Sequence, residues 1–174
     1  NSYTPVDGYL ELKESICKKF ERDNKIIYNP NQIVVSTGAK QSIANVVQAL
    51  IKPGEEVILL APFWVSYSAI VLMADGIPKI LKSDISNDFK VSAKQIDDAI
   101  SDKTKMVIIN SPNNPSGTIY NKKELNEIAG VLKKYPKVFI LSDEIYEHIN
   151  YGSEHISFAT IEEMYDRTIT VNGI

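Results

Sequence analysis

K-V-F-I-L-S-D-E-I-Y, residues 137–146, is an apolar run that ends abruptly at two adjacent carboxylates and a tyrosine. The β-branched, aromatic and aliphatic residues at 138–141 predict a strand buried on both faces of a parallel sheet. Asp143 then lies at the carboxyl end of that strand, where open α/β sheets bind their ligands. A carboxylate there is poorly solvated, so we expect it to be protonated or to have a cationic or donor partner. An Asp that simply caps the next segment would fit the same pattern.

The segments on either side alternate between helix and strand patterns. Apolar residues at helical spacing, with capping boxes at Ser92/Gln95 and Asn121/Glu124, predict helices over residues 9–25, 39–50, 66–74, 92–100 and 121–134. Short apolar runs predict strands over residues 33–35, 57–60, 77–81, 106–109, 138–141 and 168–171. This alternation predicts an α/β fold: a mostly parallel sheet with helices on both faces and no visible domain boundary.

Composition narrows the class of protein. The chain has 174 residues, of which 44% are hydrophobic, and so can bury the core of one α/β domain. Its net charge of −3, with acidic and basic residues interspersed, argues against nucleic acid as a partner. Cys17 is the single cysteine, which favours a reducing compartment, taken to be the cytoplasm. No apolar run approaches the roughly 18 residues of a membrane span, so no membrane partner is expected.

Residues that can bind a phosphate follow the predicted strand 33–35. The run T-G-A-K-Q, residues 37–41, opens a helix whose free N–H groups and dipole favour an anion. Gly38 permits close approach of the backbone, and Lys40 adds a positive charge. A glycine at a strand-to-helix turn can also be there for steric reasons alone.

Aromatic and amide side chains follow two further strands. Trp64, the only tryptophan, lies in the loop after residues 57–60, where it could stack on a planar ring or plug the sheet edge. Asn110, Asn113 and Asn114, in N-S-P-N-N-P-S-G, can donate to an anionic oxygen or simply build the turn. With the phosphate cradle and the buried carboxylate, they predict a site for a flat, phosphorylated, cationic heteroaromatic ligand.

Five motifs together resemble a known family. They are S-T-G-A-K-Q (36–41), A-P-F-W-V-S-Y (61–67), N-S-P-N-N-P-S-G (110–117), S-D-E-I-Y-E-H (142–148) and T-V-N-G (170–173). In this order they resemble the fold-type I pyridoxal-phosphate aminotransferases of classes I and II, in the aspartate aminotransferase family. The resemblance implies pyridoxal 5'-phosphate as cofactor, and amino-group transfer between an amino acid, aspartate or a similar one, and a 2-oxo acid.

The resemblance also implies roles for residues around the cofactor phosphate and ring. Gly38, Ala39 and Lys40 would bind the phosphate, and Trp64 would stack on the pyridine ring and contact the substrate. Tyr3 matches a family tyrosine that reaches the phosphate of a neighbouring subunit, which implies a homodimer with shared active sites.

The remaining implied roles concern the polar edge of the cofactor ring. Asp143 would pair with the protonated pyridine nitrogen and keep the ring an electron sink. Tyr146 and Asn114 would donate to the phenolic oxygen, Asn114 would also lie near the substrate, and Asn110 would be a further cofactor contact. Ser116 departs from the threonine usual in N-P-T-G, a conservative change.

The resemblance covers only the first part of the family's large, cofactor-binding domain. The Schiff-base lysine of the family follows T-V-N-G within a few residues, so we expect that lysine and the small domain to lie outside residues 1–174. Two alternatives stay open, because they would share the residues named above. One is a non-catalytic regulatory module of the same fold, and the other is a lyase or synthase that uses the same cofactor.

A metal site is not expected from the sequence. His148 and His155 are the only histidines, and neither has a carboxylate or cysteine pattern at ligand spacing. The chain's two arginines, Arg22 and Arg167, lie outside the motifs. A carboxylate clamp for a dicarboxylic substrate is therefore expected elsewhere.

Overall fold

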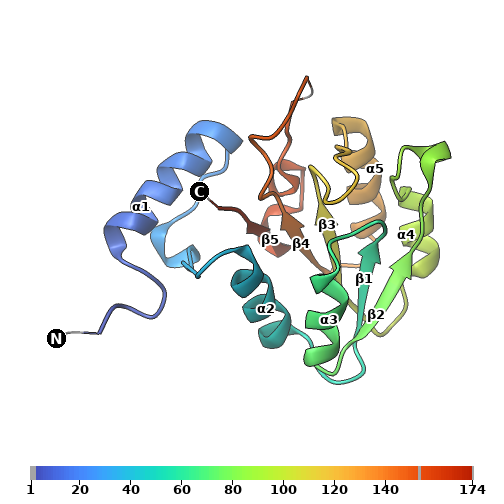
Figure 1. Cartoon of the computed structure of the whole chain (residues 1–174), viewed down its shortest axis with the longest axis horizontal. Helices are drawn as coiled ribbons and strands as arrows, with labels where there is room; N and C mark the ends of the chain where they lie inside the picture. Colours follow the sequence, from blue (N-terminus) through green and yellow to red (C-terminus); the bar gives the residue numbers. More distant parts are fainter. Residues whose placement is uncertain (1–2, 153, 174) are drawn as a thin grey trace.

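A five-stranded parallel sheet forms the centre of the computed structural model, which describes residues 3–152 and 154–173 (Figure 1). The strands are β1 Glu56–Leu60, β2 Ile77–Leu81, β3 Thr104–Asn110, β4 Phe139–Asp143 and β5 Thr168–Val171. They run in the order β2-β1-β3-β4-β5, and every neighbouring pair is parallel. The predicted α/β class is confirmed.

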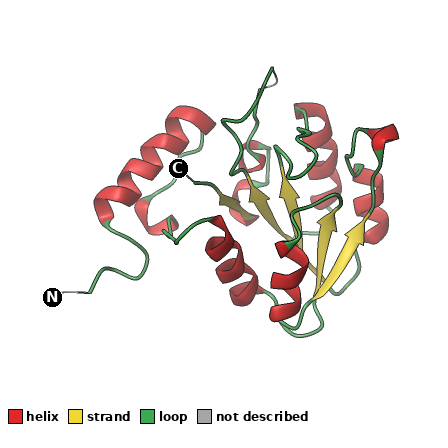
Figure 2. Cartoon of the chain, viewed as in Figure 1, coloured by secondary structure: helices red, strands yellow, loops and turns green. Residues whose placement is uncertain are grey.

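Helices cover the sheet on both faces (Figure 2). They are α2 Ala39–Leu50, α3 Ser66–Met73, α4 Ala93–Ala99 and α5 Lys122–Leu132. Two buried clusters separate the faces: α2 and α3 contribute to one, and α4 and α5 contribute to the other. Ser92 and Asn121 cap α4 and α5 through the predicted capping boxes. Each capping box satisfies backbone donors that the first helical turn leaves free.

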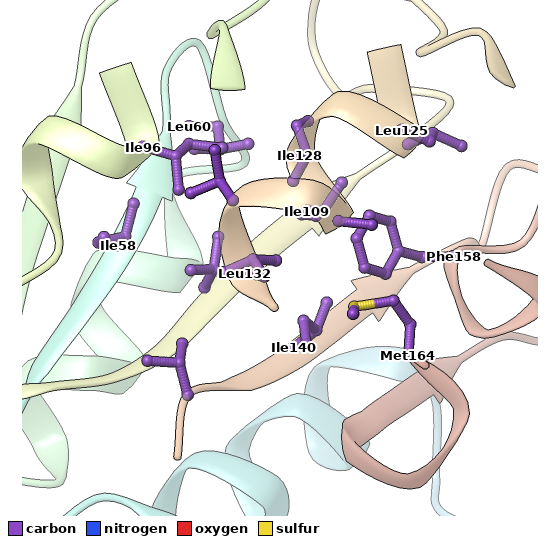
Figure 3. Close-up of a cluster of buried hydrophobic side chains, with 14 of the residues drawn as sticks. Ile58, Leu60, Ile96, Ile109, Leu125, Ile128, Leu132, Ile140, Phe158 and Met164 are labelled. Atoms are coloured by element: carbon purple, nitrogen blue, oxygen red, sulfur yellow. The ribbon is translucent and has the colours of Figure 1, made fainter. Parts of the chain in front are cut away.

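The central strands bury both faces, which explains their uninterrupted apolar sequences. On β1, Ile58 and Leu60 face α4 and α5, whereas Val57 and Leu59 face α2 and α3. Residues on one face align across strands, because Ile58 pairs with Val107. The α4–α5 cluster is drawn in Figure 3, with Leu132 of α5 in its middle.

The helix predicted over residues 9–25 has two parts. Helix α1, Leu10–Lys19, continues directly into η1, a π-helix over Phe20–Asn24. Both lie beside the sheet rather than over its faces (Figure 1). Phe20 and Ile26 pack there against Ala159.

One predicted strand is wrong. Residues 33–35 form no strand, and the described part of the sheet contains only β1 to β5. The Val35 N–H donates to the Asp7 carbonyl, 3.1 Å away. This segment therefore pairs with the N-terminal arm, residues 3–9, instead of with a strand. A run of three apolar residues carries too little periodicity to distinguish the two outcomes. No described helix combines the length and the apolar character needed to cross a bilayer.

Burial in the α4–α5 cluster gives a test of the packing. Leu132 is fully buried, whereas Leu72 on α3 is 59% exposed. Leu132→Ala should lower the free energy of unfolding by about 2–5 kcal/mol, because it removes apolar contacts and leaves a cavity. Leu72→Ala, the matched control, should change it by less than about 0.5 kcal/mol. Urea denaturation measures both, and equal effects would contradict the packing described above.

Candidate functional site

The sheet has a switch point between β1 and β3. The chain adds β2 on one side of β1 and then places β3, β4 and β5 on the other side. Loops that leave the carboxyl ends of strands at such a point run apart and leave a crevice. A cavity of about 270 Å³ opens there. It is lined by Gly38, Ala39, Lys40, Trp64, Tyr67, Asn110, Asn114, Asp143, Ile145 and Tyr146.

The structure brings together every predicted contact residue except Tyr3. Tyr3 is fully exposed on the N-terminal arm, so its reach to a neighbouring subunit stays a prediction. Tyr67 and Ile145 line the cavity but were not predicted. Tyr67 follows Trp64 by three residues at the start of α3, and this i, i+3 spacing is a signal that could have indicated it.

The start of α2 provides the anion-binding part of the cavity. Gly38 precedes the helix with φ 86°, a conformation that favours glycine. A Cβ added at Gly38 would meet no protein atom within 4 Å, so the helix start faces open space. The first N–H groups of a helix have no partner within it and attract anions. Lys40 adds a cation, with its ammonium 5.1 Å from the centroid of the Trp64 ring.

Trp64 presents a flat surface to the cavity. The Trp64 and Tyr67 rings pack in a T-shaped arrangement, with the centroids 5.5 Å apart and the planes at 89°. Both aromatic rings also pack onto the α2–α3 cluster. These contacts hold the indole in place at the edge of the cavity, where it could stack against a planar ligand.

Asp143 is the carboxylate predicted at the end of β4, and it is 3% exposed. One oxygen accepts from the Tyr67 hydroxyl at 2.5 Å and the other from the Ile145 N–H at 3.3 Å. Burial raises the pKa of the Asp143 carboxyl, and these two hydrogen bonds only partly offset that effect. Burial and the nearby Asp143 charge also raise the pKa of Tyr67, which therefore acts as the donor.

Two asparagines connect the turn after β3 to β4. The Asn110 amide donates to the Asp143 carbonyl at 2.9 Å, and its oxygen accepts from the Asn114 N–H at 2.7 Å. Asn110 therefore orders the site through protein contacts, and its predicted cofactor contact stays a prediction. The Asn114 amide lies 3.3 Å from the Tyr146 hydroxyl, so two donors meet at one point of the cavity.

Comparison with known proteins identifies the family. The sequence model of the family described as aminotransferase class I and II matches residues 1–174. The chain belongs to this family. Apart from Tyr3, the residues to which the family resemblance gives cofactor contacts all line the cavity.

Relatives of the chain carry related names. It is 45% identical to the bifunctional aspartate aminotransferase and glutamate/aspartate-prephenate aminotransferase of Petunia hybrida, covering 98% of this chain and 36% of that protein. It is 45% identical to the aspartate/prephenate aminotransferase of Cereibacter sphaeroides, covering 99% and 44% respectively. The chain thus spans less than half the length of the curated relatives it matches.

Solved structures share the fold. The aspartate aminotransferase from Rhizobium meliloti superposes with a TM-score of 0.96 at 41% identity, covering 99% of this chain and 44% of that one. The aspartate aminotransferase from Thermus thermophilus with maleate gives a TM-score of 0.94 at 37% identity, with the same coverage.

A second polar cluster lies behind the turn that carries Asp143. Glu144, Glu147 and His155 offer ligand atoms within 4.8 Å of one another. The sequence shows no carboxylate pattern at ligand spacing around His155, but the fold brings its ring close to these two carboxylates. The absence of a metal site stays a prediction.

The raised pKa of Asp143 gives a pH-dependent test. An acid whose pKa is higher in the folded state stabilises the fold below its unfolded-state value of about 4, and this contribution is lost as the pH rises through the folded-state pKa. Asn mimics the protonated acid. Asp143→Asn should therefore raise the free energy of unfolding of this protein, measured without cofactor, at neutral pH. Below about pH 4 the substitution should change it little.

Urea unfolding across this pH range measures the effect. Asp97→Asn is the contrasting control, because hydrogen bonds from Lys134 and Tyr135 lower the pKa of Asp97. Its contribution has the opposite sign: it is present above the unfolded-state pKa and lost as the pH falls through the folded-state pKa. A fall in stability at neutral pH for Asp143→Asn would contradict the assignment of Asp143 as a buried carboxyl without a cationic partner.

Proposed function

We propose that the protein is a pyridoxal-phosphate-dependent aminotransferase that moves an amino group between an amino acid and a 2-oxo acid. The observation that carries the proposal is the convergence in one cavity of a helix start, an indole face and a buried carboxylate. These groups match a phosphate, a flat ring and a ring cation respectively. The names of the relatives support the same activity.

The residues of the cavity fit pyridoxal phosphate. Gly38 and the first N–H groups of α2 would hold the phosphate, with Lys40 as a nearby cation, and Trp64 would stack on the ring. Asn114 and Tyr146 would donate to the phenolic oxygen. When bound, the cofactor supplies a covalent link to the amino acid and an electron sink for the bond broken at its α-carbon.

Asp143 would keep the ring nitrogen of the bound cofactor protonated. Its carboxylate is buried without a cationic partner among the described residues, so a protonated ring nitrogen would provide the missing positive charge. Tyr67 orients the carboxylate through its hydrogen bond. The buried Asp143 would thus stabilise the cationic form of the ring.

We propose aspartate or a similar dicarboxylic amino acid as a substrate, with prephenate as a further candidate oxo acid. The names of the relatives support both, and maleate, which is in the Thermus thermophilus structure, is itself a dicarboxylate. Arg22 pairs with Asp23, and Arg167 donates to the Tyr135 carbonyl, so both arginines lie outside the cavity. We propose that the arginine contacts to the substrate carboxylates come from elsewhere in the assembled enzyme.

We further propose a homodimer in the cytoplasm. The fully exposed Tyr3 and Val6 on the N-terminal arm support the shared active site. The single cysteine supports a reducing compartment.

Cofactor binding tests the proposal through Trp64. Pyridoxal phosphate added to the protein made from its complete gene should quench the Trp64 emission, identified as the difference between the parent and Trp64→Phe. Pyridoxal, which lacks the phosphate, should require at least about tenfold higher concentration, since it loses the contacts at the α2 start. The same preparation should transfer the amino group of aspartate to a 2-oxo acid. No quenching and no transfer would refute the function.

Labelling tests where the covalent cofactor lysine lies. Lys40 is the one lysine among the described residues that line the cavity, and we place it at the phosphate. Borohydride reduction with pyridoxal phosphate, followed by peptide mapping, should label a lysine outside residues 1–174. The Lys40→Met variant should still be labelled. Stoichiometric label on Lys40, or on another lysine within these residues, would overturn this placement.

A further inference from the structure

The turn after β4 has two sides. Asp143, Ile145 and Tyr146 line the cavity, whereas Glu144 and Glu147 are buried among contacts to other segments, with exposed fractions of 1% and 6%. Both glutamates belong to a tight turn, since the Glu147 N–H donates to the Glu144 carbonyl at 3.0 Å. Two buried carboxylates on one turn need partners, because an unpaired buried charge is costly.

Glu147 contacts the N-terminal helix and two histidines, with His148 Nε2 3.2 Å and His155 Nε2 3.9 Å from its carboxylate oxygens. The Lys19 ammonium donates to one carboxylate oxygen, and the Asn24 amide donates to the other at 2.5 Å. Lys19 also donates to the Asn24 side-chain oxygen at 2.9 Å. Each of the three side chains therefore contacts the other two, and we call this triangle the Lys19–Asn24–Glu147 clamp.

The π-helix makes this clamp possible. Lys19 ends α1 and Asn24 ends η1, so they are five residues apart. In a continuous α-helix, residues five apart point about 140° away from each other around the axis. The i→i+5 turn of a π-helix brings them close to the same side, and such turns are frequent at functional sites. Both side chains can then reach one carboxylate.

Glu144 is held by a separate set of donors. One oxygen accepts from Ser142, Ser157 and the Phe158 N–H at 2.7, 2.8 and 3.1 Å. The other oxygen lies 3.1 Å from His155 Nε2. A metal ion among Glu144, Glu147 and His155 would compete with these donors and with the Lys19 charge. The described contacts therefore favour a protein clamp over a cation site.

The clamp is one residue away from the cavity. Tyr146 precedes Glu147, and its hydroxyl lies 3.3 Å from the Asn114 amide. The Ile149 N–H donates to the Tyr146 carbonyl at 2.8 Å, so the backbone around Tyr146 is fixed on both sides. A shift of Glu147 would consequently move the Tyr146 hydroxyl relative to Asn114.

We propose that Glu147 is a positioning residue, and that the Lys19–Asn24–Glu147 clamp uses the N-terminal helix to set the position of Tyr146. The proposal rests on the function proposed above, in which Tyr146 donates to the phenolic oxygen of pyridoxal phosphate. A well-placed donor stabilises the ionised form of that oxygen. Weakening the clamp should therefore raise the pH at which the phenolic oxygen of the bound cofactor loses its proton.

Glu147→Gln tests the clamp in the protein made from its complete gene. Gln retains the size of the side chain but leaves Lys19 without its carboxylate. The pH midpoint of the cofactor's absorbance change should rise by about half a unit or more. Retention of pyridoxal phosphate should weaken by about threefold or more. Lys19→Met should shift both in the same direction, and the double variant should be far from additive, because the two residues act on one contact.

Glu124→Gln is the matched control. Glu124 forms a partly buried pair with Lys90 at 3.2 Å, and it lines no part of the cavity. Gln can also serve in the capping box of α5. This variant should leave the absorbance midpoint and cofactor retention unchanged, whatever its effect on melting temperature.

The outcomes separate the two proposals. If Glu147→Gln does not fold, Lys19→Met, whose side chain is 23% exposed, carries the test. Normal cofactor binding with an unshifted midpoint in the clamp variants would overturn the positioning role, even if their melting temperatures fall. No cofactor binding by the unmodified protein would overturn the proposed function, and the positioning role with it.

Discussion

The carboxylate of Asp143 is buried at the end of β4, and the neighbouring residues supply the hydrogen bonds that a buried carboxylate requires. A buried acid must be hydrogen-bonded, and here Tyr67 and the Ile145 N–H provide the donors. Tyr67 can reach because α3 starts directly after the loop that carries Trp64. The reversal of strand order beside β1 then leaves the crevice into which Asp143 faces.

The opposite side of the same turn holds a second buried carboxylate, that of Glu147. Burial alone would raise the pKa of Glu147, but hydrogen bonds from Asn24 and Lys19 and the Lys19 charge outweigh it, so the net shift is downward. A depressed pKa means that this carboxylate stabilises the fold above its unfolded-state value and loses that contribution as the pH falls through the folded-state pKa. Asp143 and Glu147 lie four residues apart and burial raises the pKa of both, yet their net pKa shifts are opposite because only Glu147 has a cationic partner among the described residues.

Local patterns predicted the sheet and most helices well. The strand predicted over residues 77–81 has those bounds, and both capping boxes formed, since each depends on residues close in sequence. The edge where ligand-binding groups gather was also predictable, because parallel strands bring their carboxyl ends to one side. The wrong predictions concerned contacts between residues that are far apart in the sequence. Val35 pairs with Asp7 rather than with a strand, and a run of three residues could not reveal that.

The same limit explains what was missed around the site. Lys19 and Glu147 are 128 residues apart in sequence, so no spacing rule relates them. The π-helix that aligns Lys19 with Asn24 resembles an ordinary amphipathic helix in sequence. His155 lies eleven residues from Glu144, a spacing that only the folded loop turns into a contact.

The buried charge of Asp143 has a consequence for the life of the protein in a cell. A site that lacks a cation for its carboxylate is less stable than the same site with a bound cation, and a ligand that binds only the folded state adds stability by mass action. With the proposed cofactor, the folded fraction would rise and fall with its supply. Molecules left without it would open more often and reach proteases sooner. Vitamin B6 supply would then control how much of the protein survives, in addition to how much of it is active.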